Sequence, residues 1–207
     1  MNGMRKLIIN LWLLIDPLYY RCTRLTYIGK YRKYPSNIFR VRLTKYKGRK
    51  VTLQDGTIIQ KNDLLLKIHL HNARLLHELF HVNSDVKKAF QLYQWTKESL
   101  PGLATYLLTH KHASNIKGAI GITTLNRGVA RLGFEAIPIK NKWYKLMKMI
   151  TFFPIHLLSL TKPNVKDLRK HLEPEYIFIT KEKLLSKYVQ PPLGIRQAVK
   201  GEQNKTS

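Results

Sequence analysis

Four of the eight histidines fall in one short run, HLHNARLLHELFH, at positions 69, 71, 77 and 81. His77, Glu78 and His81 form the pattern H-E-x-x-H. Residues four apart share one face of a helix, so the two imidazoles could bind zinc while the glutamate acts as general base on the bound water. His69 and His71 would project from one face of a strand. The run is therefore a candidate metal site.

This candidate zinc site lacks an identifiable third protein ligand. Metzincins continue the pattern with a glycine, but Ser84 stands at that position. Glu98 could supply a carboxylate from the next helix, although no surrounding motif supports that role. An ordinary amphipathic helix would place the same polar residues on its solvent face without any metal. We therefore predict no cofactor, and keep a zinc-dependent hydrolase using His77, Glu78 and His81 as the alternative.

An antiparallel β-meander is predicted from residue 39 to residue 71. In NIFRVRLTKYKG, apolar residues alternate with Arg40 and Arg42, which predicts a half-buried strand with a cationic solvent face. Asp55-Gly56 has the composition of a tight hairpin turn. NDLLLKIHLHN alternates again and places its polar face at Lys67 and at the two histidines that follow.

Helices are predicted on both sides of this meander. At the N-terminus we expect two amphipathic helices, over 4–15 and 17–27, with Asp16 capping the second and Pro17 in its first turn. Further helices are expected from Asn72, over 84–98 and after Pro101. Later segments predict a strand, helix, strand unit over 116–139, a helix over 141–160, and a strand over 175–180 whose Thr180 caps a short helix.

These elements predict the α+β class, with an antiparallel β-meander followed by helices and a strand, helix, strand unit. Residues 1–30 are expected to form the N-terminal helices, residues 31–189 a single α+β domain, and residues 190–207 a flexible tail.

The net charge is +25, from 37 Lys and Arg residues against 12 Asp and Glu residues. Such a surplus attracts polyanions. The sequence has no recognition helix or RNA-binding motif, so we expect no specific nucleic-acid partner. Anionic polymers and lipid head groups are the expected ligands.

Two apolar stretches that carry lysine or arginine, 4–15 and 143–160, could lie against an anionic membrane surface, and core packing is the alternative for both. Neither is long and uncharged enough to predict a membrane span. The single cysteine, Cys22, cannot form an internal disulfide and favours a reducing compartment. We therefore expect a cytoplasmic protein, in solution or at the inner face of the membrane.

The residues predicted to contact an anionic ligand lie on the cationic strand faces, and in the glycine-bearing segment around residue 126 where a helix N-terminus could receive a phosphate or carboxylate. They are Arg40, Arg42, Lys67, His69, His71, Asn72, Asn126, Arg127 and Arg131.

Several separated stretches resemble the YkoP-like family of Bacillus and its relatives. They are DPLYYRCTRLTY, NIFRVRLTKYKG, DGTIIQKNDLLLKIHLHN, SLPGLATYL, IKGAIGITTLNRGVARLGFE and EYIFITKEKLLSKY, which together cover about residues 8 to 188. Similar domains occur fused to polysaccharide deacetylases, which implies a role near cell-envelope polysaccharide metabolism. The resemblance carries over no catalytic residues and no deacetylase activity.

From this resemblance and the charge we expect a noncatalytic or accessory module of envelope-polysaccharide metabolism. It would bind an anionic ligand or a partner protein of envelope biosynthesis.

Overall fold

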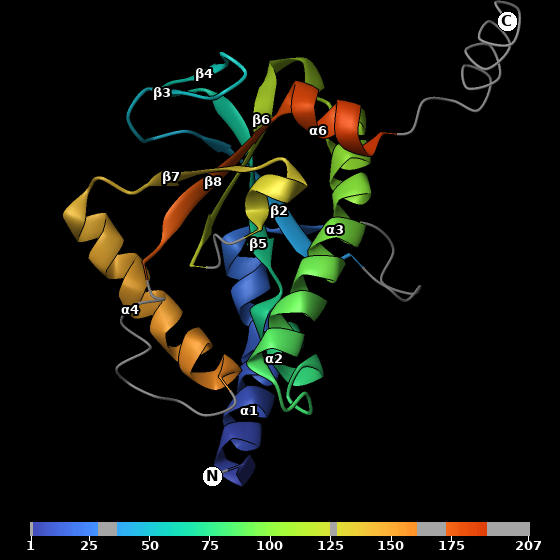
Figure 1. The fold of residues 1–207 in the computed structure, drawn as a ribbon, viewed down its shortest axis with the longest axis vertical. Coiled ribbons are helices and arrows are strands. Elements are labelled where there is room, and N and C mark those ends of the chain that lie inside the picture. Colours follow the sequence, from blue (N-terminus) through green and yellow to red (C-terminus); the bar gives the residue numbers. More distant parts are fainter. Residues whose placement is uncertain (1, 29–36, 125–127, 161–172, 190–207) are drawn as a thin grey trace, which may run out of the picture.

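A computed structural model describes residues 2–28, 37–124, 128–160 and 173–189. A six-stranded mixed sheet in the order β1-β2-β5-β6-β8-β7 lies at its centre (Figure 1). Its strands are β1 (Thr26–Tyr27), β2 (Phe39–Lys45), β5 (Leu64–Leu70), β6 (Ile116–Thr123), β7 (Glu135–Pro138) and β8 (Glu175–Thr180). A separate hairpin consists of β3 (Val51–Thr52) and β4 (Ile58–Ile59). The predicted α+β class is confirmed.

The described helices surround this sheet. They are α1 (Asn2–Thr23), α2 (Asn72–Glu78), α3 (Asp85–Thr109), α4 (Lys142–Ser159) and α6 (Lys181–Tyr188), with two short 3-10 turns, η1 (Ala113–Asn115) and η2 (Val129–Leu132). Helices α3 and α6 lie on one side of the sheet, and α4 and the hairpin β3–β4 lie on the other (Figure 1). We call the α3 side the first face and the α4 side the second face.

The first face is apolar along its length. Val41 and Leu66 are buried against Leu103 of α3, as the alternation of β2 and β5 predicts. The second face is apolar only where the hairpin covers it, because Leu65, Ile120 and Phe178 pack there against Leu53 and Ile59. The remainder of the second face carries polar and charged side chains.

The strand pairing differs from a simple meander. β2 pairs directly with β5 in antiparallel register. The hairpin β3–β4, which lies between these two strands in the sequence, therefore forms a separate two-stranded sheet. β5 then pairs with β6 in parallel. Within the strand, helix, strand unit, β8 inserts between β6 and β7, and the expected helix is the single turn η2 in the described residues. Only long-range pairing determines these neighbours, so local alternation could not reveal them.

The prediction of two N-terminal helices is wrong, because α1 runs through Pro17 as one helix. Asp16 does not cap a second helix. Its carboxylate accepts hydrogen bonds from both terminal nitrogens of Arg40 on β2, and the bond from Nη1 to Oδ1 is 2.9 Å long. The guanidinium of Arg40 also lies over the rings of Tyr20 and Tyr27, 5.6 and 4.7 Å from their centroids. This buried contact attaches the middle of α1 to the sheet.

Helix α3 likewise continues through Pro101, where a helix boundary was predicted. Ser99 does not cap a new helix, because its hydroxyl accepts a hydrogen bond from the backbone N–H of Ile38 at 3.1 Å. The predicted cap at Thr180 is confirmed, because its side chain accepts from Lys183 N–H at the start of α6. The predicted helix from residue 84 is also present, and the side chain of Ser84 accepts from Lys87 N–H at its start. The predicted tail, 190–207, lies outside the described residues.

The Arg40–Asp16 contact gives a direct test of how α1 is held. Asp16→Leu leaves a guanidinium buried without its carboxylate, and we expect it to lower the free energy of unfolding by about 3–5 kcal/mol. Combining Asp16→Leu with Arg40→Met should recover most of that loss, because no buried charge is then unpaired. Urea unfolding followed by circular dichroism measures both.

Arg21→Met, which removes an exposed cation of the same helix, is the matched control and should change stability by less than about 0.5 kcal/mol. An Asp16→Leu protein as stable as this control would contradict the anchoring role of the pair.

Candidate functional site

A cluster of basic side chains lies on the polar part of the second face. Arg42 of β2 stands directly opposite Lys67 of β5, and Arg40 stands opposite His69. Lys148 of α4 approaches the same place, and its charge acts on Lys67. We call Arg42, Lys67, His69 and Lys148 the second-face basic cluster. All four side chains are half-buried.

Two tyrosines border this cluster. The ring of Tyr144 on α4 stacks on that of Tyr176 on β8, with centroids 6.2 Å apart. The amine of Lys148 lies 5.4 Å from the centroid of the Tyr144 ring. Helix α4 therefore turns Tyr144 and Lys148, four residues apart, toward the sheet.

The charges in this cluster repel one another. Burial, together with the charges of Lys148 and Arg42, lowers the pKa of Lys67 to about 8. Burial and the charge of Arg42 also lower the pKa of Lys148. Directly opposed like charges on paired strands are destabilising. Within the described residues, neither lysine nor Arg42 forms an ion pair with a carboxylate.

His69 is neutral at ordinary pH. Burial lowers its pKa to about 3, with further contributions from the charges of Lys67 and Arg42. Its Nε2 atom is buried and has no hydrogen-bond partner among the described residues. The buried Nε of Arg42 also lacks one, although Nη1 of that residue donates to the carbonyl of Thr23 at 3.5 Å. Buried polar atoms are usually satisfied, so these atoms mark a place where a ligand or water could bind.

The prediction that Arg40 faces solvent is wrong. Arg40 is only 2% exposed, and its guanidinium forms an ion pair with the carboxylate of Asp16. His71 joins the same contact, with its Nε2 3.0 Å from Oδ2 of Asp16. Burial and the charge of Arg40 lower the pKa of His71 to about 4, so its imidazole is neutral beside the Asp16 carboxylate. Burial raises the pKa of Asp16, but the hydrogen bond and charge of Arg40, with those of His71, hold it below its usual value. These residues therefore anchor α1.

The remaining predicted ligand residues do not join the cluster. Asn72 is the first residue of α2. Arg131 is exposed in η2, and its carbonyl accepts a hydrogen bond from Lys187 of α6, which places it on the side of the first face. Asn126 and Arg127 lie outside the described residues. Three further residues at this cluster, Lys148, Tyr144 and Tyr176, were not predicted from the sequence. A pattern in the sequence could have indicated the first two, because they lie four residues apart in an apolar helix and so share one face.

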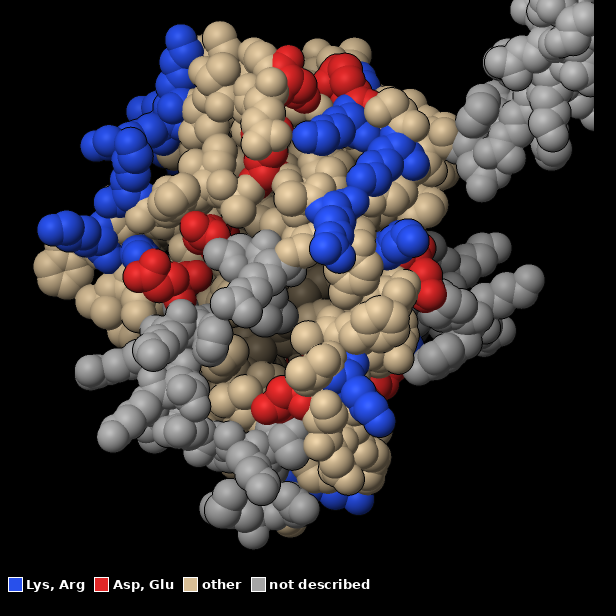
Figure 2. All heavy atoms as spheres, viewed as in Figure 1, with Lys and Arg blue, Asp and Glu red and all other residues tan. Residues whose placement is uncertain are grey.

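Many other cations are exposed away from the cluster. Figure 2 shows Lys and Arg side chains along the margin beside the hairpin β3–β4 and over α6. The exposed basic residues near the hairpin are Lys45, Lys47, Arg49, Lys50 and Lys61. Such solvated cations contribute long-range attraction to polyanions, whereas the half-buried cluster offers a defined place for an anion.

The H-E-x-x-H residues do not lie on one helix. α2 ends at Glu78, and His81 follows in a turn closed by hydrogen bonds from Phe80 N–H to His77 O and from Val82 N–H to Leu79 O. The carboxylate of Glu78 accepts a hydrogen bond from Nε of Arg74 at 2.6 Å. The helical spacing on which the zinc hypothesis relied is therefore absent.

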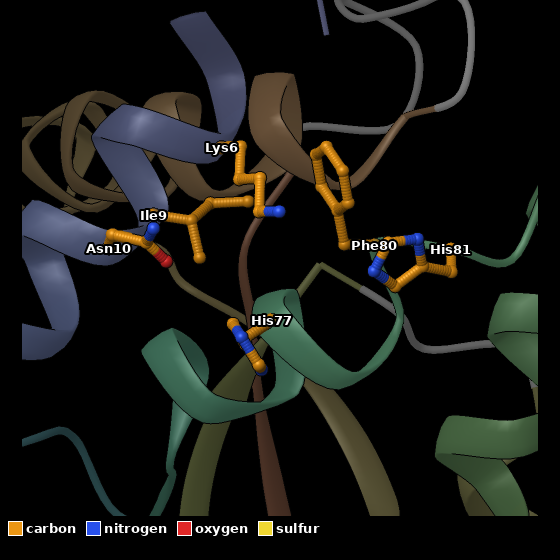
Figure 3. Close-up of a pocket in the computed structure, with 6 residues that line it drawn as sticks. All are labelled: Lys6, Ile9, Asn10, His77, Phe80 and His81. Carbon is orange, nitrogen blue, oxygen red and sulfur yellow. The ribbon is translucent and has the colours of Figure 1, made fainter. Parts of the chain in front are cut away.

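His77 and His81 instead line a small pocket with Lys6, Ile9, Asn10 and Phe80 (Figure 3). The pocket has room for about one water molecule. The amine of Lys6, which the picture shows reaching into this space, would repel a cation there. Within the described part of the chain, no three side chains of histidine, cysteine, aspartate or glutamate are grouped as metal ligands. No described helix is long and apolar enough to cross a membrane.

Comparison with known proteins gives one family. The model of a family described as the YkoP domain matches residues 5–188. The chain is 45% identical over 185 residues to "Uncharacterized protein YkoP" of Bacillus subtilis (strain 168), an alignment that covers 89% of this chain and 98% of that protein. No solved structure matches the chain.

The zinc hypothesis is tested by metal content. If H-E-x-x-H held zinc, protein purified without chelator would contain about one metal per chain, and His77→Ala would lose it. Because α2 ends before His81, we expect elemental mass spectrometry to find no such stoichiometric, His77-dependent metal. One metal per chain that disappears in His77→Ala would reverse this expectation and make the alternative, a zinc-dependent hydrolase, the leading function.

The buried histidines predict acid sensitivity. Below about pH 6.5 the unfolded chain binds a proton at His69 and at His71, whereas the folded protein stays neutral at both until the pH nears 3 and 4, respectively. The free energy of unfolding should therefore fall as the pH is lowered from 6.5 toward 4. Urea unfolding at a series of pH values measures the slope.

His69→Gln should make that slope shallower, because one of the two proton-binding differences is removed. His77→Gln replaces an exposed imidazole and should leave the slope of the parent unchanged. Equal slopes for His69→Gln and the parent would show that His69 does not stay neutral in the folded protein.

Proposed function

The chain belongs to the YkoP domain family, and on that premise we propose that it is a noncatalytic accessory module of cell-envelope polysaccharide metabolism that binds an anionic ligand. The ligand would sit on the second-face basic cluster. The observation that carries this proposal is that Arg42, Lys67 and Lys148 are half-buried together with no carboxylate partner among the described residues.

Electrostatics favours an anion at this position. Half-burial of like charges is costly, and it is offset when a negative group takes the place of the missing carboxylate. Arg42 can hold a carboxylate or phosphate through its planar guanidinium, while the two lysines supply compact positive charge. The unpaired Nε2 of His69 and the hydroxyls of Tyr144 and Tyr176 add polar contacts to the same face. A phosphate-bearing or carboxylate-bearing carbohydrate has the chemistry that these groups recognise.

A binding role fits this cluster better than a catalytic one. The cluster offers positive charge and hydrogen-bond donors, and the described residues bring no carboxylate or thiol to it. Its neutral imidazole, His69, lies among cations and has no carboxylate in the described residues that would orient it as a general base. The link to envelope polysaccharides comes from the family resemblance. It makes anionic polymers, lipid head groups and envelope-biosynthesis proteins the proposed partners, and the cytoplasm, at the inner face of the membrane, the proposed location.

Removing the charge of the cluster tests this function. We expect the variant Arg42→Gln/Lys67→Gln/Lys148→Gln to be at least as stable as the parent without ligand, because mutual repulsion is relieved. Inorganic phosphate, or an oligomer of uronic acid, should raise the melting temperature of the parent by about 3–6 °C at ten times its dissociation constant. It should raise that of the variant by less than about 1 °C. Differential scanning calorimetry at fixed ionic strength measures both.

The matched control, Lys47→Gln/Arg49→Gln/Lys50→Gln, removes the same net charge from the exposed hairpin region. It should retain the anion-dependent rise of the parent. A neutral oligosaccharide should stabilise none of the three proteins. If the two triple variants lose the rise equally, anion binding follows net charge alone and the proposed site is wrong.

A further inference from the structure

Helix α1 is oriented opposite to an ordinary amphipathic helix. Its only acidic residue, Asp16, faces the sheet and is buried with Ile9. Its apolar residues face outward, with Leu14 76% exposed and Leu7 68% exposed. At 100° per residue, the exposed apolar side chains cover about 120° of the helix surface. They are Leu7, Ile8, Leu11, Leu14, Ile15 and Leu18.

Helix α4 repeats this arrangement on the same side of the molecule. Tyr144 and Lys148 face the sheet, while Trp143 is 79% exposed. The outward apolar residues recur at helical spacing, at Trp143, Leu146, Met147, Ile150 and Phe153. Both α1 and α4 pack against α2. The eleven exposed residues of the two helices form what we call the α1–α4 apolar surface.

The charges beside this surface are positive. Exposed cations lie at the ends of both helices, with Lys6, Arg21 and Arg24 on or just after α1, and Lys140 and Lys142 at the start of α4. The segment of α4 contains no acidic residue, and the carboxylate of Asp16 is occupied by Arg40. A broad apolar surface with basic ends matches the chemistry of an anionic bilayer interface.

We propose that the α1–α4 apolar surface docks the protein onto an anionic membrane, with both helices lying in the interface and neither crossing it. Leucine and isoleucine side chains would enter the boundary between head groups and acyl chains, and Trp143 would lie at head-group level. The lysines and arginines at the helix ends would contact anionic phosphates.

A second copy of the chain is the competing occupant, since Leu7, Leu11, Leu14 and Leu18 have heptad spacing. Two observations favour the membrane instead. Ile8 and Ile15 widen the stripe well beyond the narrow seam of a two-stranded coiled coil, which usually has charged residues at such flanking positions. Two chains of net charge +25 would also repel each other, whereas an anionic bilayer attracts them.

Vesicle co-sedimentation tests the proposal with the full chain. The parent should bind vesicles of phosphatidylglycerol and phosphatidylcholine at least about tenfold more tightly than vesicles of pure phosphatidylcholine. Leu11→Ser/Leu14→Ser and Trp143→Ser/Met147→Ser should each weaken binding to the mixed vesicles by about tenfold or more, because exposed apolar side chains are lost. Brominated lipid should quench the fluorescence of the parent more than that of Trp143→Phe.

The matched control is Val86→Ser/Phe90→Ser, which removes two exposed apolar side chains from α3, outside the α1–α4 apolar surface. It should bind vesicles as the parent does. Equal loss in the control, or normal binding by either helix variant, would overturn the proposal. So would a dimeric parent that becomes monomeric in Leu11→Ser/Leu14→Ser and never binds vesicles.

The replaced residues are exposed, so each variant should keep the circular dichroism spectrum of the parent. Each should also keep the phosphate-dependent rise in melting temperature. The membrane proposal is therefore independent of the anion site on the second face, and either can fail while the other stands.

Discussion

The buried contact between Arg40 and Asp16 is the constraint on which the arrangement of the second face depends. Asp16 is the only acidic residue before Asp55, and Arg40 lies near the start of β2 between the buried Phe39 and Val41. Burying that arginine without a carboxylate would be too costly, so α1 must turn its acidic side toward the sheet. The leucines on the opposite side of α1 are consequently left facing outward. One ion pair thus determines both how α1 is attached and which surface it presents.

Two different elements cover the second face, the hairpin β3–β4 at one end and helix α4 at the other. Near the hairpin β3–β4 it is apolar, and the hairpin is secured by the hydrogen bond from the hydroxyl of Thr180 to Asp55 at 2.7 Å. Farther along, the same strands carry Arg42, Lys67 and His69 beneath α4. Helix α4 adds Lys148 to this region instead of a carboxylate, so the cluster keeps an excess of positive charge.

Neighbouring like charges, unpaired buried polar atoms and exposed apolar side chains all lower the stability of a folded protein. Such features often mark functional sites, because a bound ligand can offset their free-energy cost. The opposed Arg42 and Lys67, the unpaired Nε2 of His69 and the exposed leucines of α1 are all of this kind. The first face has no comparable feature among its described residues, since it is apolar throughout and covered by α3 and α6. The first face therefore stabilises the fold, and both binding roles that we propose fall on the second face and its covering helices.

The sequence by itself determined the α+β class, the strands around Val41, Leu66 and Phe178, and the hairpin at Asp55-Gly56, because alternation and turn chemistry are local. It also placed Arg42 on the polar side of one strand and Lys67 and His69 on the polar side of another, since side chains alternate along a strand. The shared face of these two strands came from their pairing in the structure. Only the tertiary structure decided which of these side chains are free. Arg40 and Arg42 have the same local pattern in the sequence. Asp16, from a helix distant in the sequence, forms an ion pair with Arg40 but not with Arg42. Likewise, α1 and α3 continue through their prolines, and Lys148 joins the cluster, because packing against the sheet outweighs local propensity.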